Sequence, residues 1–354
     1  MNRRDFFRPT RLARTAGQIL GALEEARGEK TQSSLPDLAL LRVARPAMAT
    51  TFEVLVPYGT PGALDAAEAA LNEVDRLEGQ LTVYRETSEV SRLNRLAAVT
   101  AVPVEEGLYQ LLALAQRFTR ETDGAYDIST GALIKAWGFY RRCHRVPSAD
   151  ERGEVLTRVG MSHVVLESEG RTVRYLRPGL EINLGSIGKG YALDRAAGLL
   201  RQDWNLTAAL LHGGHSSVYA IGTAPGDERG WAVGIRHPWD TERRIAVVRL
   251  RDRALGTSAV TFQHLEHEGR KLGHLLDPRT GWPAEAMASA SALAPTAAEA
   301  DALATAFFVL GVDGARAYCA KHRAVGAVLL PEGNAAPVVI GLSDNDIDLV
   351  PPAK

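Results

Sequence analysis

The stretch EINLGSIGKGYALDRAAG, residues 181–198, runs from a short apolar segment through a glycine-rich turn directly into a helical pattern. Three glycines in it surround Ser186 and Lys189. Glycine lets a backbone approach a ligand closely, and a helix N-terminus presents free N–H groups to an anion such as phosphate. The spacing matches neither a Walker A loop nor a dinucleotide-binding fingerprint. This stretch alone therefore leaves two interpretations open, a phosphate site or a tight strand-to-helix turn with an exposed lysine.

Strand and helix patterns are mixed on both sides of this turn. Apolar periodicity predicts helices at 65–82, 104–124, 190–202 and 298–311, with Gly124 and Gly311 closing the second and the last. Strands rich in β-branched and aromatic residues are predicted at 50–56, 163–168 and 172–176, and in TAALLHGG, SSVYAIG, WAVGIRHP, RRIAVVRLRD, AVGAVLLPEG and AAPVVIGL. Because the two types do not alternate strictly, the sequence favours an α+β or an irregular α/β class.

The composition is that of an ordinary globular chain. Its 354 residues carry a formal net charge of −1, so no global field attracts nucleic acid or anionic lipid. Cys143 and Cys319 are the only cysteines, which excludes a disulfide framework and a cysteine-rich metal site. No segment approaches the roughly 18 unbroken apolar residues of a membrane-spanning helix. We therefore expect neither a nucleic-acid partner nor a transmembrane span.

The N-terminus differs from the rest of the chain. Its start, MNRRDFFR, resembles a twin-arginine export signal, but charged residues interrupt the apolar region that should follow. We expect residues 1–37 to form a separate arm, residues 38–345 the globular domain and residues 346–354 a C-terminal tail. A cytoplasmic location is favoured, with export through the N-terminal arm as the alternative.

A carboxylate and a hydroxyl stand four residues apart in the last predicted helix. Asp301 and Thr305 therefore share one helical face. Both are hard oxygen donors of the kind that Mg²⁺ accepts, alongside water and phosphate oxygens. An acidic residue in a first helical turn also interacts favourably with the helix dipole, so helix capping is the alternative interpretation of Asp301.

The run HLLDPRTGWP, residues 274–283, crowds titratable and turn-forming residues around one apolar pair. Its Asp-Pro and Thr-Gly dipeptides are typical of a plain surface turn. A surface turn explains His274 and Arg279 less well. We therefore take His274 and Asp277 as candidate site residues.

Two more segments combine glycines or polar residues with chemistry-bearing neighbours. In LLHGGHSSV (210–218), a Gly-Gly pair precedes His215 at a strand end, where a β-bulge or bend is the alternative. In GAYDISTGALIKAWGFY (124–140), Asp127 precedes an aromatic cluster, and Asp127 or Ser129 could instead cap a helix. Together the glycines, the lysine, the histidine, the Mg²⁺ pair and the aromatic cluster suit a nucleotide diphosphate.

An ordered set of motifs resembles those of the ApbE family, the FAD:protein FMN transferases. The set runs from about Ala47 to about Leu330 and comprises MATTFEVLV, YRETSEVSRLN, YDISTGALIKAWGF, NLGSIGKGYALD, WAVGIRHP, HLLDPRTGWP and ADALATAFFVLG. Each motif is loose by itself, whereas the full series in this order is specific. The resemblance implies an α+β fold related to the T-fold, with mixed sheets flanked by helices and an FAD site in a cleft between subdomains.

The resemblance also implies an activity and a set of site residues. The activity is Mg²⁺-dependent transfer of FMN from FAD to a Thr or Ser hydroxyl of an acceptor protein, with release of AMP. The implied catalytic residues are His274, Asp277 and Lys189, with His274 or Asp277 as the base, and the implied Mg²⁺ ligands are Ser186, Asp301 and Thr305. The implied FAD contacts are Met48, Tyr84, Asp127, Ser186, Lys189, Gly213, Gly214, His215, Ser258 and His274.

Several positions depart from the family pattern. His215 stands where the family has an acidic residue, the run SAVTFQ (258–263) lacks a tyrosine and an arginine, Ala49 replaces a glycine and Asn183 replaces an aspartate. Losing one carboxylate and one arginine from a site for a charged cofactor could weaken FAD binding. Two alternatives to the transferase therefore stay open, a non-catalytic flavin-binding paralogue and an FAD pyrophosphatase that releases FMN and AMP.

Overall fold

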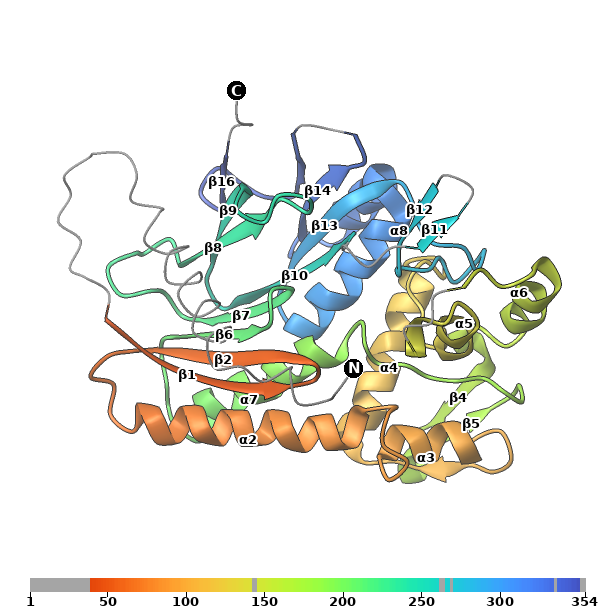
Figure 1. Cartoon of the computed structure of the whole chain (residues 1–354). Helices are drawn as coiled ribbons and strands as arrows, with labels where there is room; N and C mark the ends of the chain where they lie inside the picture. Colours follow the sequence, from red (N-terminus) through yellow and green to blue (C-terminus); the bar gives the residue numbers. More distant parts are fainter. Residues whose placement is uncertain (1–38, 142–144, 261–264, 268–269, 334–335, 351–354) are drawn as a thin grey trace, which may run out of the picture. The chain divides into compact units, whose positions relative to one another are not determined.

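The computed structural model describes residues 39–141, 145–260, 265–267, 270–333 and 336–350 (Figure 1). The chain divides into two units, residues 1–38 and residues 39–354. The expected N-terminal arm, with its twin-arginine start, lies outside the described residues.

An eight-stranded sheet forms the centre of this unit, and every neighbouring pair of its strands is antiparallel. In spatial order the strands are β1 (Leu40–Ala47), β2 (Thr50–Pro57), β6 (Ala209–Gly213), β7 (Ser217–Ile221), β10 (Arg253–Ala259), β13 (Met287–Ala294), β14 (Gly326–Pro331) and β15 (Val338–Ile340). The segments that the sequence predicted as strands in this region are thereby confirmed.

Helices cover one face of the sheet, and they are α2 (Ala63–Leu81), α7 (Gly188–Gln202) and α8 (Ala297–Lys321) (Figure 1). The alternation along β2 shows how the two faces are used. Phe52, Val54 and Val56 are buried in the core beneath these helices, whereas Leu55 faces the other way. Such alternation is what a strand buried on both faces requires.

A three-stranded sheet covers the opposite face. Its order is β16 (Ile347–Leu349), β9 (Arg244–Leu250) and β8 (Trp231–Arg236), all antiparallel. Trp231 and Val248 pack there against Leu55 and Leu293 of the large sheet. Residues 347–349, which lie in the segment expected to be a C-terminal tail, therefore pair with β9 as a strand.

The remaining elements surround α4 (Glu106–Glu121). They are α3 (Glu89–Leu96), α5 (Gly131–Ala136), α6 (Ala149–Leu156), the sheet β3 (Val102–Pro103), β5 (Thr172–Tyr175) and β4 (Val164–Glu167), and the hairpin β11 (Leu265–His267) with β12 (Arg270–Leu272). The predicted hairpin at 163–176 is confirmed, with Gly170 at φ +74° in its turn. The mixed architecture confirms the α+β class.

The predicted helix at 298–311 ends differently from the expectation. Gly311 does adopt a left-handed conformation, with φ +71°, as a closing glycine should. The chain then resumes helical structure immediately and continues to Lys321, so Gly311 kinks α8 instead of ending it. Within the described part of the chain α8 is also the one helix with the length and mean hydropathy of a membrane span, and more than half of its apolar window is buried.

The N-terminal turns of α7 and α8 meet backbone to backbone. A Cβ atom on Gly190 would lie 2.1 Å from the carbonyl oxygen of Ala297, so a side chain here would force the helices apart. Asp194, one turn further along α7, accepts the N–H groups of Ala297 and Ala298 at 2.6 and 2.8 Å. Asp301 on α8 accepts the N–H of Gly190 at 2.8 Å. We call these three hydrogen bonds the reciprocal caps, because each helix satisfies free donors of the other.

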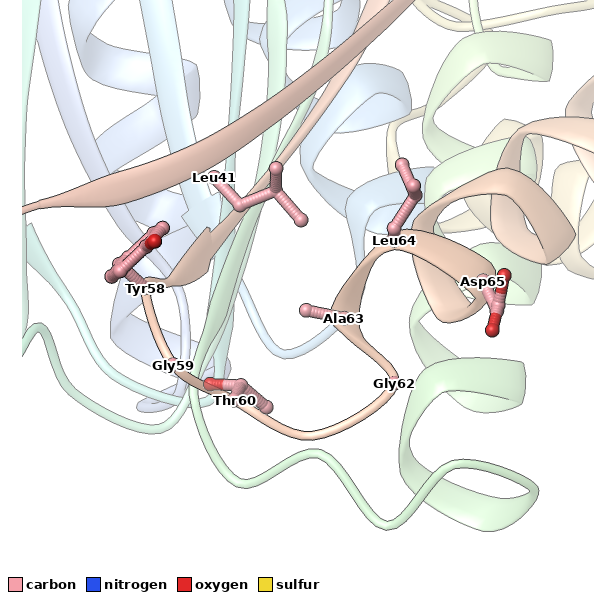
Figure 2. Close-up of a pocket in the computed structure, with 8 residues that line it drawn as sticks. All are labelled: Leu41, Tyr58, Gly59, Thr60, Gly62, Ala63, Leu64 and Asp65. Atoms are coloured by element: carbon pink, nitrogen blue, oxygen red, sulfur yellow. The ribbon is translucent and has the colours of Figure 1, made fainter.

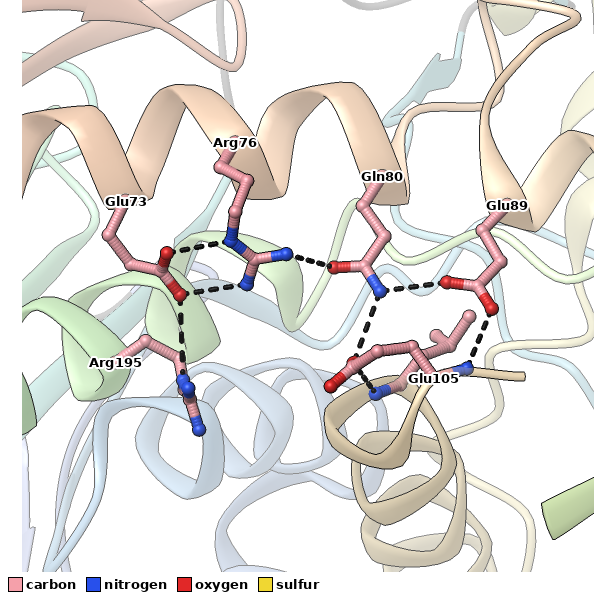
Figure 3. A network of polar contacts seen from close by, with 7 residues as sticks. Glu73, Arg76, Gln80, Glu89, Glu105 and Arg195 are labelled. Atoms are coloured by element: carbon pink, nitrogen blue, oxygen red, sulfur yellow. Dashed lines mark hydrogen bonds and ion pairs between the residues drawn. The ribbon is translucent and has the colours of Figure 1, made fainter. Parts of the chain in front are cut away.

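A network of polar side chains links α2 to α7, α3 and α4 (Figure 3). Glu73 of α2 pairs with Arg76 on the same helix and with Arg195 of α7. Gln80, at the end of α2, donates to Glu89 at the start of α3 and to Glu105, the N-cap of α4. The network thus joins four helices at the surface.

The Gly190 contact can be tested with a second glycine of the same helix. Gly190→Ala should lower the free energy of unfolding by about 3 kcal/mol or more, because the new methyl group overlaps backbone that cannot rotate away. Gly198 has no heavy atom within 4 Å of its hypothetical Cβ. Gly198→Ala should therefore stabilise the protein by roughly 1 kcal/mol through helix propensity. Urea unfolding of both variants is the measurement, and equal effects would refute the close approach.

The turn between β1 and β2 gives a second prediction. Met48 and Ala49 both have positive φ, 48° and 61°, which disfavours residues with a Cβ. Ala49→Gly should therefore stabilise the protein by about 1 kcal/mol. Ala44, within the exposed face of β1, is the matched control. Ala44→Gly should destabilise, since glycine weakens a strand interior, and a loss of stability in Ala49→Gly would contradict the strain.

Candidate functional site

Asp301 lies at the centre of the residues that the sequence singled out. Its carboxylate accepts the Gly190 N–H at 2.8 Å and the hydroxyl of Ser217, with 2.7 and 2.9 Å to the two oxygens. Only 7% of the residue is exposed. Asp301 therefore joins the first turn of α7, the start of β7 and the body of α8.

Burial dominates the electrostatics of Asp301. Loss of water raises the pKa of its carboxyl to about 6, although nearby Lys189 and the hydrogen bonds from Ser217 and Gly190 act to lower it. The ionised form is thus held in place mainly by one lysine and by oriented donors. A bound cation would stabilise that form further.

The alternative interpretation of Asp301 as a cap of its own helix is wrong. Helix α8 begins at Ala297, and its N-cap is Thr296, whose side chain accepts the N–H of Glu299 at 3.2 Å. Asp301 sits one turn further on and caps α7 instead. Sequence spacing alone does not reveal this, because the partner helix lies about a hundred residues away in the chain.

Thr305 follows Asp301 by one turn. Its hydroxyl donates to the carbonyl oxygen of Asp301 at 3.2 Å and lies 3.1 Å from the hydroxyl of Ser258 on β10. The pairing places two hydroxyls on the side of α8 that faces the sheet. The expected Asp301 and Thr305 face is thereby extended by Ser258, one of the predicted flavin contacts.

The glycine turn before α7 is shaped by Asn183. Its side-chain oxygen accepts the N–H of Gly185 at 2.8 Å, a bond that an aspartate could make equally well. Ser186 follows, and its hydroxyl lies 3.4 Å from that of the fully buried Tyr126. The Asn183 departure thus preserves the local shape of the turn.

Lys189 stands beside the end of β6. The position of a hypothetical Cβ on Gly213 is 3.6 Å from the Cβ of Lys189. Gly213 pairs with Ser217 across the β6–β7 turn, and Ser217 binds Asp301. The structure therefore brings Lys189, the Gly-Gly turn and Asp301 together.

The Gly213–Ser217 segment is a hairpin turn that packs on the β1–β2 turn. Gly214 has φ +70°, and a Cβ there would lie 2.3 Å from the Thr50 hydroxyl oxygen. Its N–H donates to the carbonyl oxygen of Thr51 at 2.9 Å. Met48, in the neighbouring turn, packs at the edge of the main core. These contacts connect two predicted flavin-contacting segments.

His215 occupies the exposed tip of this turn. Partial burial of the imidazole lowers its pKa below 6.5, the positive charge of Arg236 lowers it further, and Glu53 opposes both. His215 is therefore neutral at neutral pH. Neighbouring His212 on β6 is more deeply enclosed, and burial lowers its pKa to about 4.

The run 274–283 has a structural explanation for its charged pair. Arg279 binds both carboxylate oxygens of Asp277, at 2.9 Å through Nε and at 2.8 Å through Nη2. The loop is anchored from below, because the indole N–H of buried Trp137 donates to the carbonyl oxygen of Gly281 at 2.9 Å. His274, by contrast, is exposed at the start of the run.

Asp127, a predicted flavin contact, has its carboxylate hydrogen-bonded within the protein. It is 7% exposed and accepts the N–H and the hydroxyl of Ser129, at 2.7 and 2.5 Å, and the N–H of Met161 at 2.9 Å. Burial raises the pKa of its carboxyl. The N-cap of α5 is Thr130, so neither Asp127 nor Ser129 caps that helix.

The aromatic cluster predicted in residues 124–140 does not supply the exposed aromatic surface through its Trp-Gly-Phe run. Trp137 is fully buried, stacks on Phe139 and contacts Trp282 edge to face. Tyr84 is 70% exposed and stacks on Tyr140 with ring centroids 4.8 Å apart. Tyr84 was a predicted flavin contact, and it supplies an open aromatic face.

Sequence reasoning missed Ser217 and Asp194. Ser217 follows the Gly-Gly-His run. The signal that could have identified it was its place in the alternating pattern of the strand that begins there. Asp194 lies four residues after Gly190, which places both on one face of α7. That spacing marks a carboxylate directed at the same neighbour as the glycine.

The oxygen donors around Asp301 fit a hard cation only if a ligand supplies further oxygens. Within the described ranges no group of three or more His, Cys, Asp or Glu side chains gathers to hold a metal. One carboxylate with the hydroxyls of Ser258 and Thr305 supplies oxygen donors alone, the type that Mg²⁺ prefers. Mg²⁺ commonly completes such a set with water and phosphate oxygens.

A surface hollow of about 410 Å³ lies elsewhere, at the connection from β2 to α2 (Figure 2). It is lined by Leu41, Tyr58, Gly59, Thr60, Gly62, Ala63, Leu64 and Asp65. None of the predicted site residues is among them. The chemistry of the Asp301 region, rather than this hollow, identifies the candidate site.

Comparison with known proteins finds relatives that share one name. The FAD:protein FMN transferase of Treponema pallidum is 36% identical over 282 residues, which cover 74% of this chain and 77% of that protein. The enzyme of the same name from Escherichia coli K12 is 29% identical over 274 residues, 75% and 77% of the two chains. The crystal structure of the ApbE protein of Thermotoga maritima matches with a TM-score of 0.77 and 30% identity, over 85% of this chain and 97% of that one.

The family model gives the same result for most of the described domain. The model described as the ApbE family matches residues 48–329, from the β1–β2 turn into β14. This range contains every predicted site residue, including Lys189, His274 and Asp301. The chain belongs to the ApbE family.

Proposed function

We propose that this chain transfers FMN from FAD to an acceptor protein, the reaction for which its relatives are named. The observation that carries the proposal is the buried Asp301 carboxylate, held by Ser217 and the first turn of α7 beside Lys189. A lysine, a helix N-terminus and a carboxylate at one point suit a diphosphate with its counter-cation. FAD is accordingly the substrate and a second protein the partner.

The chemistry proposed in detail is a phosphoryl transfer. The hydroxyl oxygen of an acceptor Thr or Ser attacks the phosphorus of the FMN half, the bond to the AMP oxygen breaks, and AMP leaves. When bound, Mg²⁺ neutralises charge on the diphosphate. Asp301 and Thr305 would hold the ion, with Ser186 at the glycine turn as the third predicted ligand.

The base is assigned to His274 in preference to Asp277. A base must accept the acceptor's proton within hydrogen-bond reach. Both carboxylate oxygens of Asp277 are bound by Arg279, which lowers their availability, whereas His274 is exposed at the same loop. Asp277 then acts by shaping the loop, and Lys189 acts on the phosphates as a fixed positive charge.

The predicted flavin contacts divide into two groups. Met48, Gly213, Gly214, His215 and Ser258 lie on turns and strands that contact the Asp301 region directly or through one neighbour. Tyr84 offers an exposed ring, suited to stacking on a planar group. Asp127 is the exception, since its bonds to Ser129 and Met161 give it the role of supporting the turn before α5.

The first test removes the charge of Asp301. Asp301→Asn keeps an acceptor for Gly190 and Ser217 but loses the anionic ligand, so Mg²⁺-dependent AMP release from FAD should fall by about 100-fold or more. Glu299→Gln, on the same helix and paired with Arg117, is the control and should match the parent. Chromatography of AMP, FMN and flavinylated acceptor separates transfer from hydrolysis. Parent-like turnover in Asp301→Asn would overturn the assignment.

The second test concerns His215. Imidazolium attracts the diphosphate, and its pKa lies below 6.5, so attraction should appear only as the pH falls below about 6.5. We expect FAD to bind about fivefold more tightly at pH 5.5 than at pH 7.5, the factor that ~1 kcal/mol gives.

His215→Asn should lose this pH dependence of FAD binding, while His322→Asn, altered on the far end of α8, should retain it. Fluorescence titration with FAD at the two pH values is the measurement. A common flat profile for the parent and His215→Asn would place His215 outside the site.

A further inference from the structure

Asp194 is a half-buried carboxylate to which the proposed reaction assigns no role. Both its oxygens accept backbone donors, the N–H groups of Ala297 and Ala298. Burial raises the pKa of its carboxyl to about 7, against the effect of those two bonds. An acid that accepts the first two N–H groups of a neighbouring helix needs an explanation in terms of that helix.

The spacing of these residues along both helices means that the two caps together set the axial position of α8 relative to α7. Gly190 and Asp194 are four residues apart on α7, and Ala297 and Asp301 are four apart on α8. Each pair therefore lies on one face, about one turn apart. A slide of one turn, 5.4 Å, would separate both carboxylates from their donors. The reciprocal caps therefore form together at one axial position of α8.

This axial position determines the site. From α8, Asp301 must reach Gly190 and Ser217, while Thr305 must reach Ser258. Thr296 caps the start of α8 by accepting the N–H groups of Glu299 and Ala300, which both belong to α8, so these bonds do not fix α8 relative to α7. Asp194 is the side chain that ties the first N–H groups of α8 to α7.

We propose that Asp194 is a positioning residue for the transfer reaction: by holding Ala297 and Ala298 it sets where α8 presents Asp301 and Thr305 to the glycine turn. The inference rests on the proposed function. Asp194 itself contacts neither FAD nor the cation.

The test compares Asp194→Ala and Asp194→Asn with Ser88→Ala. Ser88 is a buried cap of another helix, α3, where it accepts the Ser91 N–H at 3.0 Å and donates to Thr82, so its removal costs stability away from the site. Hydrogen exchange of the Gly190 amide reports the Asp301 contact without metal or turnover. Mn²⁺ titration in the presence of FAD reports the ligand set.

We expect Gly190 to exchange at least about tenfold faster in Asp194→Ala, with Asp194→Asn intermediate because its side chain keeps one acceptor oxygen. The Mn²⁺ dissociation constant should rise by about 10- to 100-fold, as it does when partners of a ligand are removed. Ser88→Ala should leave both readouts at the parent values. Parent-like exchange and Mn²⁺ binding in Asp194→Ala would overturn the inference.

Failure of the proposed function would be seen separately. A parent protein that releases no AMP from FAD refutes the transferase and leaves the exchange comparison intact. If the parent binds no Mn²⁺, the Gly190 exchange rate decides alone: faster exchange in Asp194→Ala supports the positioning role, and an unchanged rate refutes it.

Discussion

The close approach of α7 and α8 is the constraint on which the rest of the site depends. Because Gly190 has no side chain, the first turns of two helices meet with their backbones in contact, and their free N–H groups are satisfied by Asp194 and Asp301 across the junction. The large sheet lies beneath both helices and adds Ser217 and Ser258. Lysine, carboxylate and hydroxyls converge because the helices cannot separate without leaving buried donors unpaired.

Local pattern predicted most of the elements but not their partners. Helices α2 and α4 and strand β2 agree with the predictions, because apolar periodicity reports which face of a segment is buried. Strand β16 was missed, since three residues are too few for a period and their order comes from pairing with β9. Gly311 was identified correctly as a left-handed glycine, but no local signal shows that a second helical segment follows it directly.

In the candidate site too, the sequence identified the residues but not the contacts that they make. The sequence identified Asp301, Thr305, Lys189 and the glycine turn, and the structure brings them together. It could not show that Arg279 occupies both oxygens of Asp277, because a surface turn and a catalytic loop have the same composition. The burial and the three internal hydrogen bonds of Asp127 could not be predicted for a related reason, because they are properties of the folded chain and not of the motif.

The reciprocal caps also bear on how the protein is made. Asp194 and Ala297 are 103 residues apart in sequence, and Gly190 and Asp301 are 111 apart. Contacts of such long range are closed late, since the entropy of the intervening loop must be lost first. During synthesis α7 leaves the ribosome long before α8 exists, and its first turn has no acceptor until then. A nascent or truncated chain that ends before α8 therefore lacks the carboxylate of the site, and flavin chemistry begins only with the completed domain.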